Sequence, residues 1–195
     1  MRHNSLVYAI TFTTMLSSCA TVQLPKNASV VESGGGNYLS RIDFSYSASE
    51  NKDFSKAKLC VAENLSNPDI ALQDSAGSFV GSYTKKYYQA NNTQSVSGKG
   101  LFKYLDDNNS VLIANGTISA NTAFAITDII KFEMKLSITG NKIGLILTNI
   151  SRAQQNTGSM ANSGFGPIGV SPMSRSEEAY SALEKMANQI KSCIG

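Results

Sequence analysis

The chain has 195 residues, of which 42% are apolar and 16% are charged, and its formal net charge is +3. This composition supports a packed core and excludes an intrinsically disordered polyampholyte. Lysine and arginine form no stripe, so we expect no nucleic-acid partner. The single histidine is His3, close to the N-terminus. The rest of the chain therefore lacks the residue that Ser-His-Asp catalysis, Cys-His catalysis and histidine-ligated zinc or copper require. We expect no enzymatic activity, no cofactor and no metal site.

The first residues are organised like an export signal. One positive charge at Arg2 precedes an apolar run over residues 6–16, which is shorter than the roughly 20 residues that a membrane-spanning helix needs. A charged start, a short apolar segment and small residues before a cleavage point are typical of secretory signal peptides. The run closes with Leu16-Ser17-Ser18-Cys19. This order of leucine, two small residues and cysteine resembles the lipobox of bacterial lipoprotein precursors.

The resemblance implies that the chain is cleaved between Ser18 and Cys19. It also implies a thioether from the Cys19 sulfur to diacylglycerol and acylation of the new amino terminus. Each buried methylene stabilises membrane binding by about 0.8 kcal/mol, so two or three acyl chains anchor a protein stably. Ala20 rather than aspartate follows the cysteine. In enterobacterial lipoproteins this implies an outer-membrane location, facing the periplasm or the cell surface. The alternative is an ordinary secreted protein in which Cys19 is incidental.

The segment after Cys19 is polar and ends in Ser33-Gly34-Gly35-Gly36-Asn37, a composition typical of flexible linkers. We therefore expect a signal peptide over residues 1–18, a lipidated tether over 19–37 and a single globular domain over 38–195. The alternative for part of the tether is an edge strand formed through Val30 and Val31. Neither a helix start nor a Lys-Ser/Thr pair follows the glycine run, so it predicts no phosphate-binding loop.

Alternating apolar residues at Ile42, Phe44 and Tyr46 predict the first strand of the domain. The next segments are predicted as a short strand over residues 58–62 and a turn or short helix over 68–72. Residues 78–83 and 85–89 fit either strands or helices, and we favour strands. Strands over 100–105 and 110–118 flank a polar turn at Asp106-Asp107-Asn108-Asn109.

The clearest pattern is a β-hairpin over residues 129–150. Phe132, Met134, Leu136 and Ile138 alternate with polar or charged residues, and Thr139-Gly140-Asn141-Lys142 turns the chain. Period-two alternation on both sides of a glycine turn is typical of two half-buried strands.

The chain ends in a long loop and a helix. Residues 151–174 are rich in glycine, asparagine and proline, and loops this long are often functional or disordered. Ser174 and Glu177 have the spacing of a capping box. An apolar stripe at helical spacing then predicts a terminal helix that packs on the sheet. The stripe consists of Tyr180, Leu183, Met186, Ala187, Ile190 and Cys193.

Two cysteines, Cys60 and Cys193, remain if lipid occupies Cys19. Outside the cytoplasm the compartment is oxidising, so we predict a disulfide between them. In the chain-entropy model a loop of this length stabilises the fold by roughly 4–5 kcal/mol. The alternative is two buried thiols that never meet.

Strands followed by a terminal helix, without a repeating βαβ pattern, predict an α+β fold. We expect an antiparallel sheet packed by a C-terminal amphipathic helix, after a flexible N-terminal tether. Asn115-Gly116-Thr117, the strand over residues 132–138 and the segment 144–150 resemble uncharacterised bacterial envelope lipoproteins with a TATA-binding-protein-like sheet. That resemblance implies a sheet architecture and brings no catalytic motif.

Three groups of residues have weak chemical signatures. Asp106-Asp107-Asn108-Asn109 offers oxygen ligands for calcium but lacks the spacing of an EF-hand, and a hairpin turn explains it better. Asp69 and Asp74 have the residue types of a glycosidase carboxylate pair. Lys85-Lys86-Tyr87-Tyr88 combines basic and aromatic side chains suited to phosphate or lipid headgroups. The simpler interpretation of that patch is a solvated strand end.

These features favour a non-catalytic, lipid-anchored envelope protein that acts as a binding, scaffold or inhibitor module. Its expected partners are the membrane, through the anchor at Cys19, and an envelope protein. The surfaces to test are the loop over residues 154–173 and the Lys85–Tyr88 patch. Two alternatives remain open. One is a carrier of a small ligand or lipid, which needs an apolar cavity between sheet and helix, and the other is a two-carboxylate hydrolase of cell-wall glycan.

Overall fold

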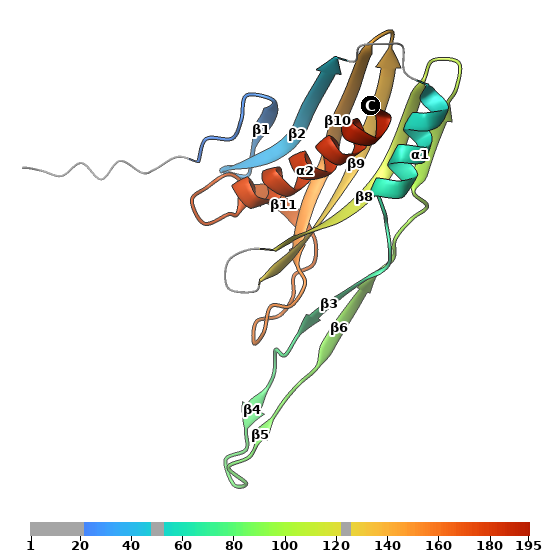
Figure 1. Cartoon of the computed structure of the whole chain (residues 1–195). Coiled ribbons are helices and arrows are strands. Elements are labelled where there is room, and N and C mark those ends of the chain that lie inside the picture. The colour runs from blue at the N-terminus through green and yellow to red at the C-terminus, as the bar shows by residue number, and fades with distance from the viewer. Residues whose placement is uncertain (1–21, 48–52, 122–125) are drawn as a thin grey trace, which may run out of the picture.

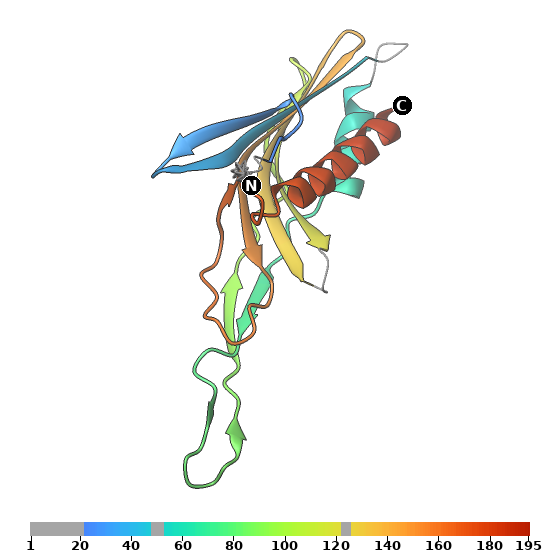
Figure 2. The same cartoon turned by 90° about the vertical axis from the view of Figure 1, so that its left-hand side faces the viewer.

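The computed structural model describes residues 22–47, 53–121 and 126–195. A large antiparallel sheet carries helices on one face, and a narrow two-stranded arm projects away from it (Figures 1 and 2). The fold class is therefore α+β, with an antiparallel sheet and a C-terminal helix, as the sequence predicted. The expected signal peptide, Ser18 and Cys19 lie outside the described residues.

The main sheet is built from strands distant in sequence. Its strands are β1 (Ala28–Ser33), β2 (Gly36–Ser47), β7 (Phe102–Asp106), β8 (Val111–Asn121), β9 (Thr127–Thr139), β10 (Lys142–Gln154) and β11 (Gly166–Gly169). Within the described ranges they form a seven-stranded sheet in the order β1-β2-β11-β10-β9-β8-β7. β2 pairs with β11 near Leu39 and with β10 from Arg41 onward, so β11 fills the space where β2 and β10 diverge.

The central hairpin of the sheet confirms the clearest sequence prediction. β9 and β10 pair from Thr139 opposite Lys142 to Asp128 opposite Gln154, and Gly140 takes the left-handed conformation that the turn needs (φ 58°). The register shifts at a bulge in β10, where Asn149 also has a positive φ of 53°. Ile150, within the bulge, packs in the core beneath the helices, whereas Ala153, beyond the bulge, packs in a second cluster.

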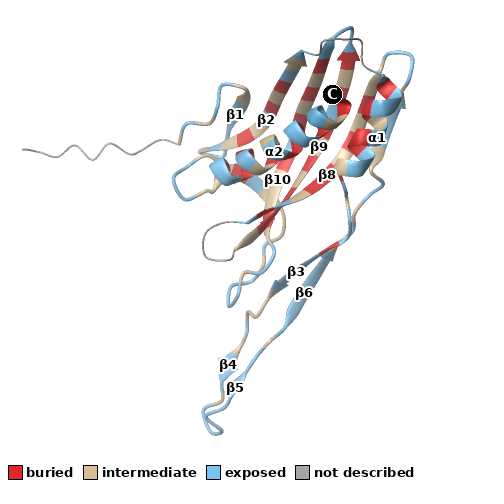
Figure 3. Cartoon of the chain, viewed as in Figure 1, coloured by how far each residue is buried: buried red, intermediate tan, exposed pale blue. Residues whose placement is uncertain are grey.

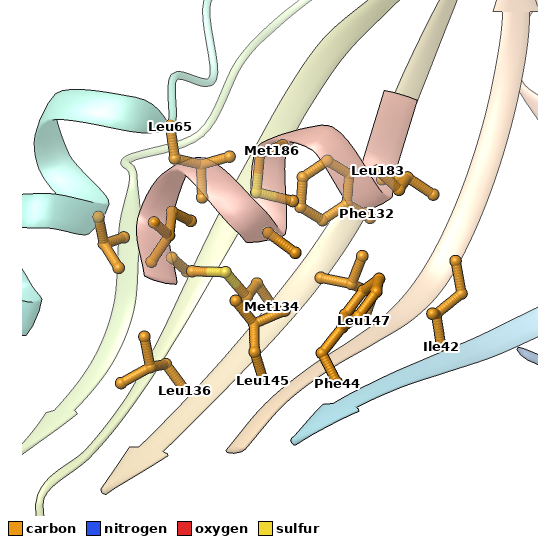
Figure 4. Close-up of a cluster of buried hydrophobic side chains, with 14 of the residues drawn as sticks. Ile42, Phe44, Leu65, Phe132, Met134, Leu136, Leu145, Leu147, Leu183 and Met186 are labelled. Carbon is orange, nitrogen blue, oxygen red and sulfur yellow. The ribbon is translucent and has the colours of Figure 1, made fainter. Parts of the chain in front are cut away.

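The terminal helix α2 (Ser176–Ile194) covers this sheet through the predicted stripe. Leu183 and Met186 lie over Phe132, Met134 and Leu147 (Figure 4). The predicted capping box is wrong, because the N-cap is Arg175 and it makes no side-chain cap hydrogen bond. The hydroxyl of Ser174 closes a local turn by donating to the carbonyl of Ser171 (2.7 Å).

The strand predicted over residues 58–62 is wrong, because these residues lie in helix α1 (Phe54–Asn64). Asp53 caps that helix by accepting a hydrogen bond from the N–H of Ser55 at 2.8 Å. Its buried residues are Phe54, Ala57, Cys60 and Val61. They recur at helical rather than strand spacing, and Leu59 points outward with 56% of its surface exposed. The apolar run at residues 59–61 looks like a strand by itself, and the helical spacing is visible only when Phe54 and Ala57 are included.

Cys60 and Cys193 meet, as predicted, with their sulfur atoms 2.00 Å apart. Because Cys60 lies in α1, the link joins two helices and not a strand and a helix. It ties α1 to the C-terminal end of α2, on the sheet face that carries both helices (Figure 1).

Part of the expected tether belongs to the sheet. Val30 pairs with Leu39 and Val31 with Tyr38 in the β1–β2 hairpin, which is the alternative left open for this segment. Gly34 and Gly35 form its turn with φ values of 57° and 79°. The boundary predicted at Tyr38 is therefore too late, since ordered pairing starts at Ala28. The glycine run is a hairpin turn.

Candidate functional site

The most distinctive feature of the molecule is an arm that projects from the sheet (Figures 1 and 2). The arm begins after Ser66, which forms a β-bridge with Thr117 of β8, and it returns to the sheet before β7. It consists of two successive pairs of short strands. β3 (Ile70–Asp74) pairs with β6 (Asn92–Val96), and farther out β4 (Phe79–Val80) pairs with β5 (Tyr87–Tyr88). The turn or short helix predicted over residues 68–72 is wrong, because the chain there enters β3. The strands predicted over 78–83 and 85–89 are present in shorter form as β4 and β5.

The base of the arm is attached by a small apolar cluster separate from the main core. Leu72 is fully buried and Ile70 nearly so, and both pack with Ile129 and Ala153 of the main sheet. Phe165 packs against the same cluster. An isolated two-stranded hairpin is marginally stable in water, so this contact stabilises the base of the arm on the sheet.

The segment after β10 braces β3 from the side. The N–H of Gln73 donates to the carbonyl of Gln155 (2.8 Å), and the N–H of Thr157 donates to the carbonyl of Gln73 (3.1 Å). Farther along, the N–H of Ser75 donates to the carbonyl of Gly158 (2.6 Å). The long loop predicted over residues 151–174 is thus partly a brace for the arm, and β10 and β11 occupy two of its stretches.

Asp74 fastens the brace to both strands of the arm. Its carboxylate accepts hydrogen bonds from the side chain of Asn92 (2.6 Å), the N–H of Asn162 (2.9 Å) and the N–H of Ala76 (2.9 Å). These donors favour the ionised form, so the pKa of Asp74 lies below its usual value of 3.8. The ionised carboxylate therefore holds three segments together at the point where the supported base ends.

Beyond residue 75 the arm has an exposed aromatic end, here called the arm tip. The arm tip consists of Phe79, Val80, Tyr83, Lys85, Lys86, Tyr87 and Tyr88. Tyr83 is as exposed as in an extended chain (101%), and Phe79, Val80 and Tyr87 each expose about three fifths of their surface (59%, 61% and 61%). Figure 3 shows that this end of the arm is mainly exposed. Clusters of exposed apolar side chains are typical of interaction sites.

The conformation of the arm tip is fixed by local contacts. The N–H of Gly81 donates to the carbonyl of Lys86 (2.9 Å), and the N–H of Lys85 donates to the carbonyl of Gly81 (2.8 Å). The rings of Phe79 and Tyr88 stack with centroids 5.1 Å apart. A Cβ at Gly81 would overlap the Tyr88 ring and the hydroxyl of Thr84, so glycine is required for this close approach. Tyr83 lies in the loop that these bonds close.

Beyond Asp74 the arm carries only positive charge. Between Asp74 and Asp106 the sequence contains no aspartate or glutamate, but it contains Lys85, Lys86, Lys99 and Lys103. Lys103 pairs with Glu133 of β9 at 2.6 Å. The two lysines of the arm tip thus add positive charge to the exposed rings.

A polar pocket of about 230 Å³ lies where the arm joins the sheet. It is lined by Asn67, Ser97, Lys99, Asn115, Gly116, Lys131, Phe132, Glu133 and Asn149. Two of its amides hold the root of the arm: Asn67 donates to the carbonyl of Lys99 (2.7 Å) and Asn115 donates to the carbonyl of Gly100 (3.2 Å). The pocket is therefore largely the hydrogen-bonded junction between arm and sheet.

A buried carboxylate of β9 lies beside the start of α2 and was not predicted from the sequence. Asp128 is 1% exposed, and its Oδ2 lies 3.2 Å from Nε of Arg175 and 3.8 Å from Nη1 of Arg152. Burial raises the pKa of Asp128 although both arginines favour its ionised form. Arg152 also donates to the carbonyl of Ser174. This cluster fixes the entry into α2, where Arg175 takes a left-handed conformation (φ 56°).

The structure places the two predicted interaction surfaces differently. Lys85-Lys86-Tyr87-Tyr88 lies in the arm tip, which adds Phe79, Val80 and Tyr83 to it. Within the loop over residues 154–173, Ile168 is buried, and Met160 is 74% exposed. That loop is thus a brace with isolated exposed residues and not a continuous apolar surface.

The acidic groups considered for chemistry serve local structure. Asp106-Asp107-Asn108-Asn109 is the turn between β7 and β8, where the Asp106 carboxylate accepts from the N–H and the side chain of Asn109 (3.0 and 2.8 Å). Asp69 accepts from the hydroxyl of Ser97 and the N–H of Gly98 (3.1 and 2.7 Å). Asp69 and Asp74 stand at opposite ends of β3, roughly 16 Å apart along an extended chain. Glycosidase pairs lie within about 10 Å of each other.

Three signals in the sequence point to the arm tip without locating it: the run without acidic residues, the density of tyrosines and the small residues between them. Tyr83 and Phe79 were missed because β4 and β5 have only two residues each, which is too few to show the alternation of a strand. Among the described residues, no helix has both the length and the apolar character to span a membrane. No family model matches the chain, and no curated protein or solved structure is significantly similar to it.

Proposed function

We propose that this protein is a lipid-anchored lipoprotein of the bacterial cell envelope that acts by binding, without catalysis, and that its arm is the binding element. The observation that carries this proposal is the arm tip, an exposed aromatic and basic surface held away from a closed core. The partner is a component of the envelope within reach of the arm.

The anchor is supported by the N-terminal sequence. Leu16-Ser17-Ser18-Cys19 matches the lipobox pattern at each position and follows a charged start and a short apolar run. Cleavage before Cys19 would leave residues 20–27 between the lipid and β1, a short link that would hold the main sheet close to the membrane.

A binding role is supported by the way the arm is built. Its base is packed against the sheet by Leu72 and braced through Gln73 and Asp74, whereas its end has no comparable packing among the described residues. A stiff base reduces the conformational entropy that the arm tip loses when it binds, and this raises affinity. The arrangement therefore favours recognition by the arm tip.

Neither alternative function fits the side chains as well. An apolar carrier needs a cavity between α2 and the sheet, but that interface is filled by fully buried side chains such as Leu183, Ile190 and Met134. The groove beside α2 is lined by polar residues: Asn64, Ser181, Glu184, Lys185, Asn188, Gln189 and Ser192. A glycan hydrolase would need a pair of facing carboxylates, and Asp69 and Asp74 are engaged separately in the arm.

Photo-cross-linking in intact cells tests the proposal. p-Benzoylphenylalanine replaces Tyr83 at the arm tip in one strain and Tyr104, which is half-exposed on β7, in a matched control strain. We expect an adduct, to protein or to lipid, at position 83 and none at position 104. Absence of any adduct at position 83 would contradict the proposed role of the arm.

A further inference from the structure

We infer that the arm tip binds an anionic membrane surface, with its tyrosine rings in the headgroup region and Lys85 and Lys86 at the lipid phosphates. The inference rests on the proposed function, because an anchored protein places the arm within reach of a bilayer, and it names the partner of the arm.

The side chains have the chemistry of a membrane interface. Tyr83, Tyr87 and Tyr88 each combine an apolar ring with a hydroxyl, and such residues are enriched where one end of the side chain meets lipid and the other meets water. Val80 and Phe79 add purely apolar surface, and both are mainly exposed. The headgroup region of a bilayer is deformable, so the exposed rings can be buried there without a matching cavity in a partner.

The charge of the arm tip complements a negative lipid surface. Lys85 and Lys86 stand among the rings, and the nearest acidic residues in the sequence are Asp74 and Asp106. A basic residue close to an anionic bilayer strengthens binding by about fivefold. With no carboxylate in the arm tip, no like-charge repulsion opposes its approach to lipid phosphates.

The backbone limits the depth of insertion. In the arm tip, Phe79 pairs with Tyr88 and Val80 with Tyr87, but a two-stranded ribbon leaves its outer N–H and C=O groups unpaired. Hydrocarbon cannot satisfy such groups, whereas water and headgroups can. The arm tip therefore enters the headgroup region and stops above the acyl chains, at the depth where tyrosine is most stable.

Vesicle co-sedimentation of the mature chain, beginning at residue 19 with Cys19→Ala, tests this inference without the lipid anchor. The vesicles are phosphatidylcholine alone or phosphatidylcholine mixed with phosphatidylglycerol. We expect binding to the mixed vesicles, weaker binding to the neutral ones, and weaker binding at high salt because surface charges are screened. No binding to the mixed vesicles, or equal binding to both kinds, would overturn the inference.

Paired variants locate the contact. Lys85→Gln with Lys86→Gln should weaken binding to the mixed vesicles roughly 30-fold, from the loss of two basic residues, and Tyr83→Ser with Tyr87→Ser should weaken binding to both kinds of vesicle. The matched controls are Lys135→Gln with Lys142→Gln, two exposed lysines of the β9–β10 hairpin, and Tyr104→Ser. The controls should bind as the parent chain does. An equal loss in the controls would overturn the assignment to the arm tip.

The cross-linking experiment separates the two proposals. A lipid adduct at position 83 supports both. A protein adduct there would overturn the membrane inference and leave the binding role of the arm standing, whereas no adduct contradicts both.

Discussion

The carboxylate of Asp74, at the end of β3, accepts a hydrogen bond of 2.9 Å from the backbone N–H of Asn162, which lies 88 residues later in the chain. Through this bond the segment after β10 holds the arm where its apolar base ends. We expect Asp74→Ala to loosen the arm beyond residue 74 and to leave the main core intact. Hydrogen exchange should then accelerate at the N–H groups of Ala76 and Asn162, which donate to Asp74, and stay slow in β9.

Asp106→Ala is the matched control for that variant. Asp106 is also a half-buried carboxylate with several hydrogen bonds, but it belongs to the β7–β8 turn. Exchange in the arm should be unchanged by it. Equal acceleration in the arm by both variants would show that Asp74 has no special role in holding it.

Acid should release the arm in the same way. The pKa of Asp74 is lower in the folded protein than its ordinary value of 3.8, mainly through the hydrogen bond from Asn92. The stabilisation from Asp74 is therefore fully present above 3.8 and is lost as the pH falls through the lowered pKa. An NMR titration of the Asp74 carboxyl should give a midpoint below 3.8 and parallel shifts at Asn162. A midpoint above 3.8 would contradict the hydrogen-bonding account.

Asp128 should contribute a pH dependence of opposite sign. Burial raises its pKa above 3.8, so between 3.8 and the raised value the folded state binds more protons than the unfolded state. The free energy of unfolding then falls as the pH rises through that window. Urea unfolding across this pH range should show this decrease in the free energy of unfolding in the parent chain. The decrease should be absent in Asp128→Asn. An unchanged slope in the variant would assign the effect to other groups.

The link between α1 and α2 should stabilise the fold strongly. Cys60 and Cys193 are 133 residues apart, and the chain-entropy model gives about 5 kcal/mol for closing such a loop. Urea unfolding of Cys60→Ala with Cys193→Ala should show a loss of this order. Reductant should destabilise the parent chain to a similar extent and leave the double variant unaffected. Insensitivity of the parent chain to reductant would show that the two thiols are not bonded.

Gly116 should be intolerant of a side chain. A Cβ there would lie 2.5 Å from the Phe132 ring and 2.7 Å from Leu65, so Gly116→Ala should lower the free energy of unfolding by about 1–3 kcal/mol through overpacking. Gly100→Ala is the control, because a Cβ at Gly100 has nothing within 4 Å. Thermal unfolding of the two variants measures the difference. Equal midpoints would contradict the packing of Phe132 against Gly116.

Regular patterns made much of the fold predictable. The β9–β10 hairpin and α2 follow from periods of 2 and 3.6 that extend over many residues, as Phe132 and Leu183 illustrate. The α1 helix was misread because its apolar residues cluster at its C-terminal half, and β3 was misread because Pro68 suggested a turn. The pairing of β1 was recognised only as an alternative, since polar composition alone does not distinguish an edge strand from a linker.

The candidate site was only partly predictable. Lys85-Lys86-Tyr87-Tyr88 stood out by residue type, but its position at the end of an arm depends on long-range contacts. The bond between Asp74 and Asn162 and the burial of Leu72 against Ala153 are such contacts, and no local pattern encodes them. Asp128, Arg152 and Arg175 come together for the same reason.

The proposed lipid at Cys19 would place the arm near a bilayer. Mass spectrometry of the N-terminal peptide of the protein isolated from its own envelope measures this directly. We predict a mature chain that begins at Cys19 and carries a diacylglycerol thioether and an acylated amine, with loss of both in Cys19→Ala. An unmodified thiol at Cys19, on a chain cleaved elsewhere, would contradict the account.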